Sequence, residues 1–139
     1  PSPAAVSERP APMDGCAPSG LPAPGVLTQP FGRWHGGIDL AVHNAIPVRA
    51  THSGEVIYAG WRDDGYGNLV IIQSGRFTTY YGHLRRLEVV AGDWLARGGH
   101  VGWSGSTGNS SGPHIHYEIR LNDRPIDPLT VTSDEFNPC

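Results

Sequence analysis

Residues 112–120 read Gly112-Pro113-His114-Ile115-His116-Tyr117-Glu118-Ile119-Arg120. From His114 onward polar residues alternate with apolar ones, which is the two-residue period of a half-buried β-strand and not the 3.6-residue period of a helix. Residues i and i+2 of a strand point to the same face, so the imidazoles of His114 and His116 should project side by side. Such a pair can bind a metal, share a proton or remain exposed and inert, and these two residues alone leave the three alternatives open.

The composition predicts a fold built almost entirely from short strands. The 139 residues include 19 glycines and 13 prolines, and the apolar runs are short and rich in Val, Ile, Tyr and Thr, as in strands joined by tight turns. A chain of this length can bury roughly two thirds of its unfolded surface, enough for one hydrophobic core. We therefore expect an all-β-dominated fold.

Charge and hydropathy exclude two classes of partner. The net charge is −3, with only ten lysines and arginines, so no basic surface follows a phosphate backbone and nucleic acid is not expected to bind. No apolar run approaches the roughly 18 to 20 residues that cross a bilayer. We expect a soluble monomer without a membrane span. Since the chain begins without Met or a signal-peptide apolar segment, we also expect a mature fragment or an excised domain.

The two cysteines, Cys16 and Cys139, lie near opposite ends of the chain. Neither has a CxxC neighbour or a histidine pair beside it, so a structural zinc site or a redox motif is not expected. We predict a disulfide between them, which in the chain-entropy model would stabilise the domain by about 4 to 5 kcal/mol. That bond would indicate an oxidising compartment. Two unpaired buried thiols are the alternative.

The composition changes near residue 25. Residues 1–24 hold seven of the 13 prolines with Ala and Ser between them, so we expect an extended arm or linker there and a folded domain over 25–139. The turn at 74–76 should join two strands as a hairpin, residues 88–99 should be irregular, and the small-residue loop 105–112 can let a polymeric substrate approach its backbone. Predicted strands cover 26–32 with its turn, 38–42, 46–50, 54–61, 69–73, 77–84, 101–104 and 114–121.

The histidines divide into two groups by their surroundings. His43, His52 and His100 lie in predicted turns, where we expect solvated side chains. The other four lie in strand-like or glycine-flanked segments. The seven histidines are His35, His43, His52, His83, His100, His114 and His116.

The second group suits a catalytic zinc ion, which takes three protein ligands and leaves one position for water. Neutral imidazoles and a carboxylate are suitable donors. His35, Asp39 and one of His114 or His116 would supply that set, and the remaining histidines would handle protons beside it.

The ordered combination of an HxxxD element at 35–39, His83-Leu84, a Gly-x-Thr-Gly loop at 105–108 and an HxH element at 114–116 resembles zinc endopeptidases of the lysostaphin/LytM type, peptidase family M23. The resemblance covers residues 25–129. Between Phe31-Gly32 and His35 the chain has only Arg33 and Trp34, so one wall of the expected groove should be reduced. The matching stretches are 31–32, 35–41, 47–50, 54–60, 65–72, 81–84 and 102–120.

This resemblance implies particular site residues. The zinc ligands would be His35, Asp39 and His116, and the catalytic histidines would be His83 and His114. It also implies an antiparallel β-sheet or sandwich of the LytM type, with long loops that form a groove floored by the sheet.

The implied activity is zinc-dependent hydrolysis of peptide bonds in bacterial peptidoglycan, in the cross-bridge or the stem peptide. The protein would be secreted, either extracellular or periplasmic, and associated with the cell wall. A zinc ion lowers the pKa of its bound water. His114 would take the water's proton and pass it to the leaving amine, and His83 would hydrogen-bond the oxyanion.

Several alternatives stay open. Tyr81 would share the face of His83 if its strand is regular, or it belongs to the core. Glu118 and Asp127 are expected to be structural or solvated and receive no role. A catalytically inactive M23-like cell-wall-binding or amidase-activator module is a rival function. A carbohydrate-binding β-module that uses the four tryptophans is another.

Overall fold

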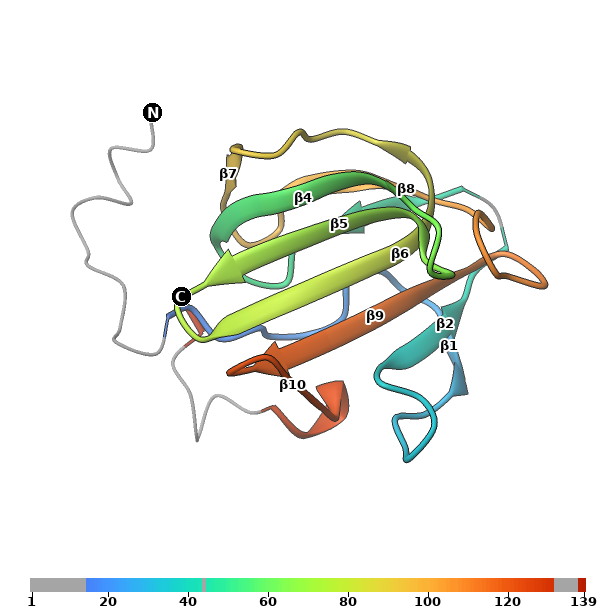
Figure 1. Ribbon diagram of the computed structural model, residues 1–139, viewed down its shortest axis with the longest axis horizontal. Coiled ribbons are helices and arrows are strands. Elements are labelled where there is room, and N and C mark those ends of the chain that lie inside the picture. Colours follow the sequence, from blue (N-terminus) through green and yellow to red (C-terminus); the bar gives the residue numbers. More distant parts are fainter. Residues whose placement is uncertain (1–14, 44, 132–137) are drawn as a thin grey trace.

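The computed structural model describes residues 15–43, 45–131 and 138–139 (Figure 1). Within these ranges every strand pairing is antiparallel and the strands form one ten-stranded sheet. The expected antiparallel, all-β-dominated fold is thereby confirmed. The elements are β1 (Val26–Gln29), β2 (Ile38–Ala41), β3 (Pro47–Arg49), β4 (Gly54–Arg62), β5 (Gly67–Ser74), β6 (Phe77–Leu87), β7 (Trp94–Leu95), β8 (His100–Ser104), β9 (His114–Leu121), β10 (Arg124–Ile126) and the 3₁₀ helix η1 (Pro128–Thr130).

The sheet brings together segments that are distant in sequence. The strand order is β1-β2-β9-β6-β5-β4-β7, with β10 on β9 and with β8 pairing both β3 and β6. Figure 1 shows β9 lying between β6 and β2. Asp39 of β2 pairs with His116 of β9 on one side, and Gly82 of β6 pairs with His116 on the other. Strand pairing therefore places the HxxxD and HxH elements next to each other.

Most predicted strands are found close to their expected positions. The 74–76 turn joins β5 and β6 as a hairpin, and Leu69 to Ile72 in β5 are all buried, as in a central strand. The segment 88–99 is less irregular than expected, because Trp94–Leu95 pairs with the start of β4. Two adjacent residues of positive φ, Asn122 (53°) and Asp123 (65°), turn the chain between β9 and β10, as in a type I′ hairpin.

The hydrophobic core lies against one face of the sheet. Ile115, Tyr117 and Ile119 of β9 are at most 1% exposed and belong to it, which confirms the alternation read from the sequence. Tyr81 is also fully buried in the core, so the core alternative for this residue is correct. Its hydroxyl accepts a hydrogen bond from Thr51 N at 3.1 Å.

The prediction of a solvated His52 is wrong. The 51–53 turn lies under the sheet, and His52 is fully buried, with Nε2 2.8 Å from Thr79 Oγ1 and Nδ1 3.0 Å from Ser53 O. Burial lowers the pKa of His52 to about 4. His100 also differs from the expectation, because it begins β8, is half-buried and packs edge-on against Trp103. His43 is exposed, as expected.

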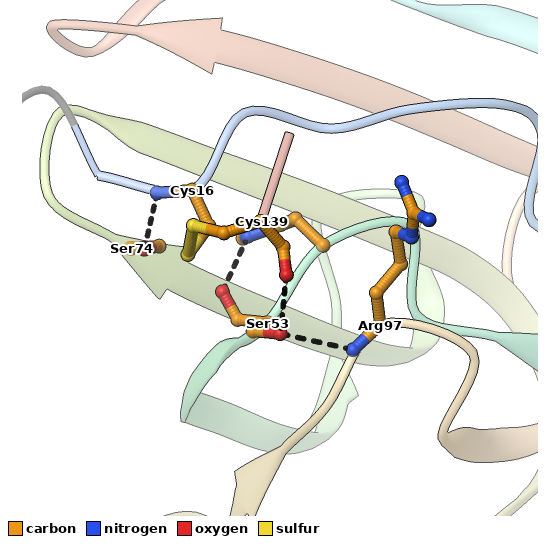
Figure 2. The surroundings of a disulfide bond; sticks show 6 residues. Cys16, Ser53, Ser74, Arg97 and Cys139 are labelled. Atoms are coloured by element: carbon orange, nitrogen blue, oxygen red, sulfur yellow. Dashed lines mark hydrogen bonds between the residues drawn. A yellow bond between two sulfur atoms is a disulfide. The ribbon is translucent and has the colours of Figure 1, made fainter. Parts of the chain in front are cut away.

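Cys16 and Cys139 form a disulfide (Figure 2), as predicted. Cys16 N donates a hydrogen bond to Ser74 Oγ at 2.7 Å. Ser53 Oγ accepts a hydrogen bond from Arg97 N at 3.1 Å and donates one to the Cys139 carbonyl at 3.3 Å. These contacts attach both cysteines to the domain beside the β5–β6 hairpin and the turn before β4.

Residues 1–14 of the expected arm lie outside the described residues. The rest of that segment packs on the domain, where Ala17 and Ala23 are buried in the core and Pro22 O accepts a hydrogen bond from Arg49 N at 2.8 Å. The domain boundary at residue 25 stays a prediction. Among the described residues, no helix has the length and apolar character needed to cross a bilayer.

Candidate functional site

A groove of about 580 Å³ contains all five residues predicted for the site. β9 supplies two of its histidines from the face opposite the core, β1, β2 and β6 supply Gln29, Asp39 and His83, and surface loops supply the rest of the lining. The lining residues are Gln29, Trp34, His35, Asp39, Asp64, Gly65, Tyr66, His83, Asn109, Ser110, Ser111, His114 and His116.

Three side chains converge on the floor of this groove. Asp39 Oδ1 lies 3.3 Å from His35 Nε2 and 2.9 Å from His116 Nδ1, and the three ligand atoms lie within 4.8 Å of one another. A tetrahedral zinc ion holds its nitrogen and oxygen donors at about 2.0–2.2 Å, which puts neighbouring donors about 3.4 Å apart. His35, Asp39 and His116 therefore fit a zinc ion in both donor type and spacing.

The outward nitrogen of each candidate ligand histidine has an acceptor. His35 Nδ1 lies 3.0 Å from the Pro30 carbonyl, and His116 Nε2 lies 2.7 Å from Glu118 Oε2. A metal-ligating histidine ordinarily donates its second N–H in this manner, which fixes the tautomer and the ring orientation. In both residues the other nitrogen is left to face Asp39.

The local backbone explains how His35 reaches the site. Gly32 and His35 exchange two backbone hydrogen bonds of 3.0 and 3.1 Å, which close a tight turn through Arg33 and Trp34. The turn leaves Trp34 87% exposed at the rim of the groove. It also brings the His35 ring to Asp39 in β2, with Nε2 3.3 Å from Asp39 Oδ1.

His83 and His114 lie beside the three candidate ligands, with ring centroids 4.5 Å apart. His83 Nδ1 is 2.7 Å from Thr107 O, and His114 Nδ1 is 2.9 Å from Gly112 O. Since both acceptors are carbonyls, each neutral ring carries its hydrogen on Nδ1 and offers the lone pair of Nε2. His114 Nε2 lies 3.8 Å from Asp39 Oδ1.

A backbone irregularity turns His83 into the groove. His83 has φ +62°, a conformation that costs a non-glycine residue roughly 1–2 kcal/mol, and the β5–β6 register shifts between Asn68 and Val70. His83 N donates to Tyr66 O at 2.8 Å. This irregularity puts His83 at the groove while Tyr81, two residues earlier, is in the core.

The surroundings of the site favour the charged form of both Asp39 and His116. Burial raises the pKa of Asp39, but the hydrogen bond from His116 and the nearby imidazoles lower it more, so the carboxyl group is ionised at neutral pH. Burial lowers the pKa of His116, yet its hydrogen bonds to Asp39 and Glu118 raise it to about 9 overall. A divalent cation would therefore compete with a proton for His116 Nδ1.

Glu118 is the residue of this region that the sequence analysis missed. It is only 3% exposed and contacts His116 directly, so the solvated alternative is wrong and the structural alternative is correct. The two-residue period of β9 carries the signal that could have found it, because Glu118 shares a face with His114 and His116. Asp127 lies at the N-terminus of η1, where its side chain accepts a hydrogen bond from Leu129 N.

Comparison with known proteins identifies the family expected from the sequence motifs. Residues 33–128 match the sequence model of Peptidase family M23. The chain is 41% identical over 117 residues to the DD-carboxypeptidase/endopeptidase Mpg of Neisseria meningitidis serogroup B, covering 76% of this chain and 26% of that protein. It is 41% identical over 112 residues to the Lipoprotein NlpD/LppB homolog of Pseudomonas aeruginosa, covering 78% of this chain and 37% of that protein. The chain thus spans about a quarter to a third of the length of these relatives.

Solved structures share the fold. The catalytic domain of the antimicrobial peptidase lysostaphin from Staphylococcus simulans superposes with a TM-score of 0.66 at 34% identity, covering 77% of this chain and 87% of that one. A zinc-containing peptidase from Vibrio cholerae superposes with a TM-score of 0.65 at 27% identity, covering 88% of this chain and 39% of that one.

Proposed function

Because the chain belongs to peptidase family M23, we propose that it is a zinc endopeptidase that hydrolyses peptide bonds of bacterial peptidoglycan, in the cross-bridge or the stem peptide. The observation that carries the proposal is the convergence of His35, Asp39 and His116 on the floor of a groove that also holds His83 and His114. The relatives named as peptidases support it. The disulfide favours an oxidising location, secreted or periplasmic.

In this proposal His35, Asp39 and His116 hold the zinc ion. When bound, zinc acidifies water and polarises a carbonyl oxygen. His114 offers the lone pair of Nε2, so it can take a proton from the attacking water and return it to the leaving amine. Ser110 Oγ, 3.1 Å from His114 Nδ1, and Gly112 O hold the ring in the orientation that this transfer needs.

His83 stabilises the oxygen of the scissile carbonyl as that oxygen gains negative charge. Its Nδ1 hydrogen is directed at Thr107 O, so donation from Nε2 requires the protonated ring. Burial lowers the pKa of His83, and the neutral form dominates before the reaction. Because His114 takes the proton of the attacking water, His83 takes its second proton from solvent as the oxyanion forms and returns that proton to solvent when the oxyanion collapses. Preorganised donors of this kind are typically worth about 3 to 4 kcal/mol.

The zinc content and the peptidoglycan hydrolysis of the wild type and two variants test the assignment of ligands and catalytic histidines. The wild type should contain one zinc per chain and release peptides from purified peptidoglycan until a chelator is added. His35→Ala should lose zinc, whereas His114→Ala should retain zinc and lose about 10²- to 10⁴-fold in rate. A wild type that hydrolyses peptidoglycan without metal would refute the proposal.

An inactive cell-wall-binding or amidase-activating module is the second candidate. It is kept because one relative at 41% identity is named as a lipoprotein and not as a peptidase. The presence of all five predicted site residues in one groove favours catalysis. A wild type that retains zinc and binds peptidoglycan without releasing peptides would favour the module.

A further inference from the structure

The polar face of β9 carries His114, His116 and, two residues further on, the buried carboxylate of Glu118. Glu118 lies on the face of His114 and His116 and pairs across the sheet with Tyr80. With 3% exposure, this carboxylate cannot rely on water for its hydrogen bonds, and a buried charge is tolerated only when protein donors satisfy it.

Three side chains supply those donors. Oε2 accepts a hydrogen bond from His116 Nε2 at 2.7 Å and a further one from the Tyr66 hydroxyl. Oε1 accepts hydrogen bonds from Arg120 Nε at 3.0 Å and forms an ion pair with Arg120 Nη2 at 2.9 Å. Each carboxylate oxygen thus has a partner within the protein, and Glu118 does not line the groove.

The contact with His116 selects which of its nitrogens faces the metal position. Because Nε2 donates its hydrogen to Glu118, Nδ1, the atom 2.9 Å from Asp39 Oδ1, is the nitrogen that would offer its lone pair to a metal ion after losing its proton. His35 presents the opposite nitrogen, Nε2, and directs Nδ1 at a backbone carbonyl. The two histidines therefore use different atoms, and a side-chain carboxylate, not the backbone, determines the choice for His116.

Tyr66 connects this carboxylate to the groove wall. It lies in the turn between β4 and β5 and lines the groove. Its hydroxyl binds Glu118, and its carbonyl accepts the backbone N–H of His83 at 2.8 Å. Gly82 allows the ring to approach, since a Cβ there would lie 3.2 Å from Tyr66 Cδ1. Tyr66 thereby contacts both Glu118, which binds the candidate ligand His116, and the backbone of the candidate catalytic residue His83.

We infer that Glu118, held by Tyr66 and Arg120, is a positioning residue that fixes His116 with Nδ1 toward the zinc ion and so raises the affinity for zinc. The inference rests on the proposed function, because it takes His116 to be a ligand. Residues in this relation to a ligand histidine typically contribute 10- to 100-fold to metal affinity.

Zinc affinity, measured by competition with a chromophoric chelator on the full chain, tests the inference. Glu118→Gln keeps the size of the side chain but would direct an amide N–H₂ group at either His116 or Arg120, so it should weaken zinc binding by about 10- to 100-fold. Tyr66→Phe should weaken it by less than about tenfold. The Tyr66→Phe change should have little further effect on top of Glu118→Gln, because it acts through Glu118.

The matched control is Glu88→Gln. Glu88 likewise accepts hydrogen bonds from an arginine and an aromatic N–H, those of Arg86 and Trp103, but it does not line the groove. Its zinc affinity should equal that of the wild type. At saturating zinc, the peptidase rate of Glu118→Gln should approach that of the wild type. Loss of a catalytic residue would lower the rate even with zinc bound, so this result identifies a positioning residue.

The outcomes separate this inference from the proposed function. A wild type that binds no zinc would overturn the proposed function itself. A wild type that binds zinc, with Glu118→Gln binding it equally well, would overturn only the role of Glu118. Should Glu118→Gln fail to fold, as judged by circular dichroism, an unchanged zinc affinity of folded Tyr66→Phe would overturn the inference instead.

Discussion

The buried imidazole of His52 should make the stability of this domain fall as the pH falls from 7 to 4. Burial lowers the pKa of His52 to about 4 in the folded protein, whereas an unfolded histidine has a pKa of about 6.5. Between these values the unfolded chain binds a proton that the folded chain does not. Stability is therefore complete above pH 6.5 and decreases as the pH falls through this window.

The size of the effect follows from the shift. A difference of about 2.5 pKa units, at 1.36 kcal/mol per unit, corresponds to about 3 kcal/mol lost by pH 4. The hydrogen-bond partners of the His52 ring, Ser53 O and Thr79 Oγ1, are neutral, and no charged neighbour contributes to its pKa shift. Burial is thus the dominant cause.

Urea unfolding of the wild type and of His52→Gln at several pH values measures this effect. All other ionisable groups are the same in both proteins, so the difference in unfolding free energy isolates His52. Between pH 7 and pH 4 the wild type should lose about 3 kcal/mol more unfolding free energy than His52→Gln loses. His43→Gln, at an exposed histidine, should follow the wild type. Parallel curves for the wild type and His52→Gln, or a His52 NMR titration midpoint near 6.5, would refute the reasoning.

Two further predictions concern the stability of the fold. Replacing Cys16 and Cys139 by Ser removes a cross-link across 123 residues, and should lower the unfolding free energy by about 5 kcal/mol; equal urea midpoints for the double variant and the wild type would contradict this. Gly37→Ala should cost about 1–3 kcal/mol, because its Cβ would lie 2.3 Å from Tyr117 O in β9. The control Gly36→Ala, whose Cβ has 3.8 Å to its nearest neighbour, should melt within a degree or two of the wild type, and equal melting of both variants would show that the close approach is absent.

The period of two residues made β9 readable from the sequence. It assigned Ile115 and Tyr117 to the core and His114 and His116 to the opposite face, because strand geometry fixes side-chain direction from position alone. The same rule extends to Glu118, whose contact with His116 the sequence analysis overlooked. The paired cysteines were equally readable, since two cysteines in one chain allow one intramolecular disulfide.

Other features depended on backbone detail that no residue pattern specifies. Alternation would put Tyr81 and His83 on one face, but the positive φ of His83 and the shifted register of β5 and β6 put Tyr81 in the core and His83 at the groove. His52 has the local sequence of an exposed turn. Only the packing of that turn beneath the sheet buries it.

The sequence by itself determined the strand content, the face of each β9 side chain and, through the order of its motifs, the family to which the chain belongs. Tertiary structure alone decided that Asp39 pairs with His116 across two strands and that the Tyr66 hydroxyl reaches Glu118. The reason is physical: side-chain direction along a strand is local, whereas hydrogen-bond partners 50 to 80 residues apart exist only once the sheet has closed its register.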